Sequence, residues 1–203
     1  MNQFDGFRCS LRRFSDELLL YDRLLMLIKV NPELCTGCRA CEEFCSINQE
    51  GLINPELSRI HVYKDYVNNI FLPILCVPCS EKPCISACPE EQAIILDKNT
   101  GAVIIQEEFC TGCSKCIRAC EIGAIGFLKQ KGRGKKEKAV AVKCNQCNGD
   151  PWCVKVCEPQ ALQYIESNSE MDGQVIFDQL CSDLSQLDPN FYGTGIGRGI
   201  RKK

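Results

Sequence analysis

Sixteen of the eighteen cysteines in this 203-residue chain fall into four short runs, and their spacing constrains the fold more than any other feature. The first and third runs read C-x2-C-x2-C-x3-C, the spacing of a loop that binds a cubane [4Fe-4S] cluster. The second and fourth have longer middle gaps, C-x2-C-x4-C-x3-C and C-x2-C-x5-C-x3-C. The runs are Cys35, Cys38, Cys41 and Cys45; Cys76, Cys79, Cys84 and Cys88; Cys110, Cys113, Cys116 and Cys120; and Cys144, Cys147, Cys153 and Cys157. Sixteen thiolates predict four [4Fe-4S] clusters with four ligands each.

Two other uses of clustered cysteine compete with this interpretation. Disulfide frameworks belong to short secreted chains, usually below about 100 residues. Structural zinc usually takes two separated C-x2-C pairs that close one tetrahedral site. In the first and third runs three cysteines crowd into seven residues instead. Three such thiolates suit one cube, while the fourth reaches a neighbouring cluster, as in two-cluster ferredoxins. Zinc remains the non-redox alternative.

Composition limits the possible partners and the compartment. The 24 basic and 26 acidic residues leave a net charge of −2, which argues against a strongly basic nucleic-acid binder. No stretch approaches the ~20 apolar residues that span a bilayer, so we expect no membrane insertion. Many reduced thiolates suit a reducing compartment, which predicts a cytoplasmic protein. Because metal-ligand free energy becomes folding free energy, we expect the apo-protein not to fold.

The four runs mark an internal repeat, since they begin at positions 35, 76, 110 and 144. Residues 93–96 and 102–105 flank turn residues and predict one hairpin, and residues 125–128 and 139–142 predict a second. Each unit is then a cysteine loop, a helical turn and a short strand pair. The predicted fold class is α+β, with two pseudo-symmetric bacterial-ferredoxin-like modules, each binding two clusters.

Three segments are expected along the chain. Residues 1–34 form an N-terminal extension with a short helix capped by Ser15 and a strand at residues 24–30. Residues 35–165 form the double ferredoxin-like core with all four motifs. Residues 166–203 form a C-terminal tail, whose apolar residues we expect to bind a partner.

Little else in the chain suggests chemistry, and we expect no catalytic residue. The single histidine, His61, lies on an alternating segment and is predicted to be a surface strand residue. Cys9 and Cys181 lie far from any C-x2-C pair and are predicted to be free thiols.

The cysteine motifs resemble the four-cluster iron–sulfur subunits that partner molybdenum and tungsten oxidoreductases, over about residues 24–166. Two stretches, NPELSRI at residues 54–60 and CNGDPWCVK at residues 147–155, are most similar to the small subunit of tungsten aldehyde:ferredoxin oxidoreductase-type complexes, which include class II benzoyl-CoA reductase. The resemblance implies a large catalytic subunit with a tungsten or molybdenum pterin as partner, and a further flavin or ferredoxin subunit.

The resemblance also implies which cysteines share a cluster, with the first run paired to the fourth and the second to the third. It groups Cys35, Cys38 and Cys41 with Cys157; Cys144, Cys147 and Cys153 with Cys45; Cys76, Cys79 and Cys84 with Cys120; and Cys110, Cys113 and Cys116 with Cys88. Only Cys88 is followed by the proline of the ferredoxin motif; Ser46, Glu121 and Glu158 replace it elsewhere. We expect this departure to change loop geometry and not ligand number.

The leading hypothesis is therefore an electron-transfer subunit without catalytic residues, relaying electrons between a pterin-containing catalytic subunit and a second redox module. One alternative is the ferredoxin-like subunit of a hydrogenase or formate dehydrogenase complex. Another is a free polyferredoxin carrier with no fixed partner. The residues outside the cysteine core favour a docked subunit over a free carrier. Substrate chemistry would reside in another chain.

Overall fold

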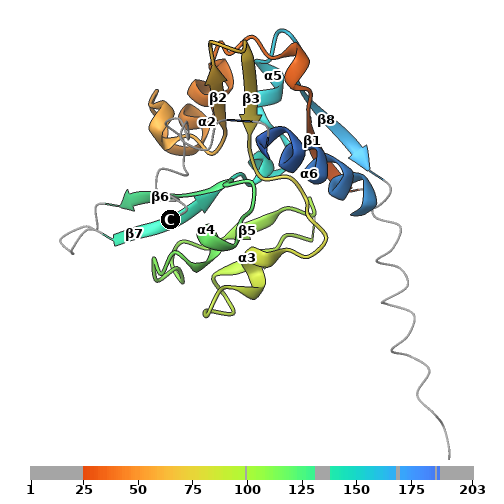
Figure 1. The fold of residues 1–203 in the computed structure, drawn as a ribbon. Coiled ribbons are helices and arrows are strands. Elements are labelled where there is room, and N and C mark those ends of the chain that lie inside the picture. The colour runs from red at the N-terminus through yellow and green to blue at the C-terminus, as the bar shows by residue number, and fades with distance from the viewer. Residues whose placement is uncertain (1–24, 99, 131–137, 168–169, 186, 188–203) are drawn as a thin grey trace, which may run out of the picture.

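The computed structural model describes residues 25–98, 100–130, 138–167, 170–185 and 187. Within them the chain forms short helices and four two-stranded antiparallel sheets (Figure 1). The strands are β1 (Leu25–Val30), β2 (His61–Asp65), β3 (Ile70–Ile74), β4 (Ile94–Leu96), β5 (Val103–Ile105), β6 (Ile125–Gln130), β7 (Lys138–Lys143) and β8 (Leu162–Ser167). The helices are α2 (Ala40–Glu50), α3 (Pro83–Ser86), α4 (Lys115–Ala119), α5 (Trp152–Lys155) and α6 (Glu170–Ser185), with 3-10 turns η1 (Pro32–Leu34), η2 (Pro55–Leu57) and η3 (Gln146–Gly149).

Both hairpins predicted between the cysteine runs are present. β4 pairs with β5, and β6 pairs with β7. The β4–β5 turn closes through Asp97, whose backbone N–H donates to the Ala102 carbonyl at 2.8 Å. The Asp97 carboxylate accepts the backbone N–H of Thr100 at 3.0 Å, as short polar side chains do in turns. Contacts between neighbouring residues therefore close the β4–β5 turn.

The outermost sheet joins the two ends of the cysteine core. β1 pairs antiparallel with β8, with Val30 opposite Leu162. The N–H of Asn31 continues this ladder to the Ala161 carbonyl at 2.8 Å. The boundary expected at residues 34/35 falls between η1 and the first cysteine, and that at 165/166 falls inside β8. The helix predicted near Ser15 and the thiol of Cys9 lie outside the described residues.

Helix α6, in the segment expected as a C-terminal tail, covers part of the core. Leu180 is only 2% exposed and belongs to a buried cluster with Tyr63, Leu72 and Val77. Phe177, Leu184 and Leu187 pack against the same cluster. These apolar side chains therefore pack against the chain's own core. Partner binding by residues 166–203 stays a prediction. Phe191 and Tyr192 lie outside the described residues.

His61 lies on a strand, as predicted, but its side chain is buried instead of exposed. It is 8% exposed and lies on the same face of β2 as Tyr63. Its Nε2 is 2.9 Å from the Ser58 carbonyl, and its Nδ1 is 4.0 Å from the carboxylate of buried Glu42. These polar contacts allow a histidine to occupy the inward face, which alternation alone did not predict.

The helices after the cysteine loops contact each other in two pairs. α2, after the first loop, packs against α5 in the fourth, and α3 packs against α4. In Figure 1 the first pair lies with β2 and β3, while α3 and α4 lie with the β4–β5 and β6–β7 hairpins. Cysteine runs distant in sequence are thereby brought together.

Candidate iron–sulfur sites

Four cavities within the described residues are lined by cysteines. We name them by one central cysteine each. The Cys38 site is lined by Cys35, Cys38, Cys41 and Cys157; the Cys147 site by Cys45, Cys144, Cys147 and Cys153; the Cys79 site by Cys76, Cys79, Cys84 and Cys144; and the Cys113 site by Cys88, Cys110, Cys113 and Cys116.

Each cavity receives cysteines from two different runs. In three of them the lining cysteines are the same four that the sequence resemblance groups together. The Cys79 site differs, because Cys144 lines it and Cys120 does not. Cys120 is nevertheless near, since burial and then the thiolates of Cys76 and Cys84 raise its pKa to about 12. Cys144 lines two cavities and so lies between the Cys147 and Cys79 sites.

The first and third loops reach their cavities through the same backbone turn. Gly37 and Gly112 have φ values of +69° and +72°, and Arg39 and Ser114, two residues later, have +67° and +66°. A Cβ at Gly112 would lie 2.4 Å from the Ala139 carbonyl oxygen. This close approach and the left-handed φ explain why glycine is found between these cysteines.

Backbone amides point at several of the cysteine sulfurs. Sγ of Cys45 accepts the N–H of Arg59 at 3.3 Å, and Sγ of Cys120 accepts that of Ala124 at 3.4 Å. Sγ of Cys110 accepts the N–H of Ala141 on β7, also at 3.4 Å. Hydrogen bonds of this kind stabilise the negative charge of metal-bound thiolates.

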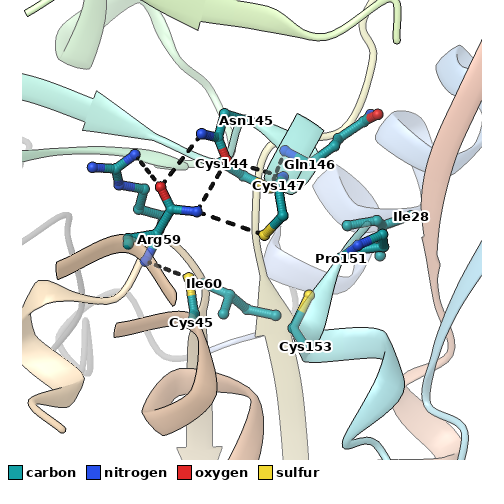
Figure 2. A pocket seen from close by; sticks show the side chains of 11 residues that line it. Ile28, Cys45, Arg59, Ile60, Cys144, Asn145, Gln146, Cys147, Pro151 and Cys153 are labelled. Carbon is teal, nitrogen blue, oxygen red and sulfur yellow. Dashed lines mark hydrogen bonds between the residues drawn. The ribbon is translucent and has the colours of Figure 1, made fainter. Parts of the chain in front are cut away.

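The Cys147 site has further polar side chains around it (Figure 2). Gln49 Nε2 donates to Cys147 Sγ at 3.6 Å and to Asn145 Oδ1 at 3.2 Å. The guanidinium of Arg59 orients Gln49 by donating to its Oε1 at 2.6 Å. Arg59 also pairs with Glu50 at 3.0 Å and with Glu107 at 3.5 Å. This network fixes a donor amide against a cysteine of the site.

Burial and neighbouring anionic groups raise the pKa of several of these cysteines. Burial and neighbouring thiolates raise the pKa of Cys144 to about 12 and that of Cys116 to about 11. Burial also raises the pKa of Cys41, together with the Glu42 carboxylate and neighbouring thiolates, and burial and neighbouring thiolates raise that of Cys153. Four thiolates around one cavity therefore require a positively charged group among them, as bound metal provides.

In each of the four sites the cysteine side chains line a cavity and do not meet around one atom position. Within the described residues, no three His, Cys, Asp or Glu side chains come close enough for one metal ion. Soft thiolates around a larger cavity suit an iron–sulfur cluster better than a tetrahedral zinc ion. The residues present therefore fit the predicted cofactor.

Sequence reasoning missed three residues near these cavities: Gln49, Arg59 and Lys143. Arg59 lies in the stretch NPELSRI and Lys143 directly precedes Cys144, but neither position predicts that the side chain is near a cavity. Cys181 is half-buried, packs against the core under α6 and lines none of the four cavities. That it is a free thiol stays a prediction.

No helix among the described residues has the length and apolar character needed to cross a membrane.

Comparison with known proteins identifies two matching domain types. Residues 67–139 match the 4Fe-4S dicluster domain, and residues 28–48 match the 4Fe-4S binding domain. Together these matches include cysteines of the first three runs.

Several curated proteins are similar to this chain. The polyferredoxin-like subunit of the aliphatic sulfonate oxidoreductase from Pyrococcus furiosus is 45% identical over 93 residues, 46% of this chain and 53% of that subunit. The chain thus spans about half the length of this relative. Electron transport protein HydN from Escherichia coli is 36% identical over 126 residues, covering 55% of this chain and 69% of HydN. Among solved structures, the BamBC active-site complex of benzoyl-CoA reductase with benzoyl-CoA has a chain that is 25% identical to this one. The TM-score is 0.41, and the match covers 79% of this chain and 91% of that chain.

Proposed function

Because this chain belongs to the family of 4Fe-4S ferredoxin-type electron-transport proteins that includes HydN, we propose that it is the electron-relay subunit of an oxidoreductase complex, holding four [4Fe-4S] clusters in two ferredoxin-like modules. The observation that carries the proposal is the crossing of cysteines between runs at all four cavities. When bound, the clusters supply one-electron transfer. The chain supplies the thiolates, the amide donors and the shielding from water.

The proposed ligand sets follow the cavities, with Cys120 as fourth ligand at the Cys79 site. Cys144 then remains a ligand at the Cys147 site. Because it also lines the Cys79 site, the ligand sets of these two sites lie close together. Exposure supports a relay with two ends. Cys38 and Cys113 are exposed, whereas the Cys147 and Cys79 sites have only buried or half-buried cysteines. Each end therefore offers a place for a redox partner.

We propose a tungsten or molybdenum pterin subunit as the partner at one end, and a flavin or ferredoxin subunit at the other, in the cytoplasm. The Pyrococcus relative is named as a subunit of an oxidoreductase, which favours a fixed complex over a free carrier. The resemblance of residues 54–60 and 147–155 to the small subunits of tungsten enzymes favours the pterin partner. The substrate belongs to that partner.

Anaerobic isolation of the tagged chain from its own host tests this proposal. We expect brown protein with about sixteen iron and sixteen labile sulfide per chain, together with a large subunit that contains tungsten or molybdenum. Full iron content in a chain that elutes alone would favour the free carrier. Stoichiometric zinc with little iron would overturn the electron-transfer proposal itself.

A further inference from the structure

Lys143 is a lysine in an unusual position, at the end of β7 and directly before Cys144. Lys143 is only 3% exposed. Lysine is almost never buried to this extent unless its charge is paired. The contacts of its ammonium group therefore indicate which groups balance its charge.

The ammonium lies between two cysteine runs. Nζ donates to the Cys144 carbonyl at 3.1 Å and, in a short contact, to the Val103 carbonyl on β5. The side chain lines the Cys79 site together with Cys76 and Cys84. Within the described residues, no carboxylate forms an ion pair with it. Its counter-charge must come from the cavity.

The electrostatics of Lys143 agree with this geometry. Cysteines of two runs, Cys76, Cys84 and Cys144, line the same cavity as this buried side chain. The anions that hold the charge are thus cysteines of the proposed ligand sets. A second cation at this cavity, Lys82, is partly exposed, so water screens its charge.

We propose, building on the function proposed above, that the buried charge of Lys143 raises the reduction potential of the cluster at the Cys79 site. Reduction adds one negative charge to a group that is already anionic when its thiolates are bound. A fixed cation beside it, away from water, favours the reduced form more than the oxidised form. The Cys79 site would then hold the electron more strongly than its neighbours in the relay.

Redox titration of the anaerobic protein, followed by electron paramagnetic resonance (EPR), tests this inference. Lys143→Gln keeps a donor for the Val103 carbonyl and removes the charge. We expect it to weaken reduction of one cluster at least tenfold, about 59 mV for one electron. The shifted signals should be those perturbed by Cys84→Ser. As a matched control, Lys155→Gln removes a lysine charge whose side chain is 57% exposed, and should leave all potentials unchanged.

The outcomes separate this inference from the proposed function. Four intact clusters with unchanged potentials in Lys143→Gln would mean that Lys143 only fills space and caps a carbonyl, which overturns the inference alone. An unaltered chain without four clusters would overturn the proposed function. If Lys143→Gln fails to bind its clusters, redox titration of the unaltered protein still tests the inference. Its Cys79-site signals must be the first to appear on stepwise reduction, and a later appearance refutes the inference.

Discussion

Substituting Gly112 by alanine should remove one cluster and leave the rest of the protein folded. The added Cβ would lie 2.4 Å from the Ala139 carbonyl oxygen, whereas ordinary contacts begin near 3.4 Å. The loop would have to move away from β7 by about 1 Å, because the opposing atom is backbone and cannot rotate aside. That movement also pulls Cys110 from the Ala141 N–H that its sulfur accepts.

The cost has two parts, and a control separates them. The left-handed φ of +72° costs an alanine about 1–2 kcal/mol, and the overlap adds about 1–3 kcal/mol. Gly51 has a similar φ of +75° but no atom within 4 Å of its Cβ position. Gly51→Ala therefore carries the conformational cost alone. Gly37→Ala is intermediate, because its Cβ meets the movable ring of Phe71.

Iron and sulfide analysis after anaerobic reconstitution measures the outcome, with EPR to identify the missing cluster. We expect Gly112→Ala to retain about twelve of about sixteen iron, and Gly51→Ala to retain all of them. Phe71→Ala should rescue Gly37→Ala. Equal iron content in Gly112→Ala and Gly51→Ala would refute the argument, because the overlap with Ala139 would then have no consequence.

Three further predictions use the same preparation. Cys45→Ser should perturb the EPR signals of the Cys147 site; changes confined to the Cys38 site would show that the crossed ligand assignment is wrong. Leu180→Ala should lower the free energy of unfolding by about 2–5 kcal/mol, because a side chain that is 2% exposed leaves a cavity under α6; urea denaturation of the loaded protein measures this, and exposed Val175→Ala is the control. Deleting residues 188–203 should leave the iron content unchanged but release the large subunit in size-exclusion chromatography; retained assembly would refute an attachment role for this segment.

Local signals in the sequence were sufficient for part of the fold. Asp97 and Thr100 form the β4–β5 turn from neighbouring residues alone, and glycine between two cysteines implies a tight loop. The direction in which an amphipathic segment faces is not local. The spacing of Phe177, Leu180 and Leu184 indicates an apolar face, and a partner or the chain's own core would satisfy it equally.

The same limit applies to the candidate sites. Cysteine spacing identifies the ligands because three thiolates must lie within one short loop. Lys143 lines a cavity and Arg59 donates its backbone N–H to a cysteine sulfur because tertiary packing places them there, and local sequence does not predict that packing. His61 was predicted on the wrong face because alternation defines two faces without saying which one is buried.

The pairing of β1 with β8 has a consequence for how the protein is made. The Cys38 site needs Cys157, and its supporting sheet needs residues 162–167, so neither exists until nearly the whole core has been synthesised. The Cys113 site needs only residues 88–116 and the neighbouring strand β7. During synthesis the Cys113 site can thus assemble while the first cysteine loop, made earliest, still waits for its last ligand. The first loop is therefore the one that waits longest, from its own synthesis to that of Cys157, before its set of lining cysteines is complete.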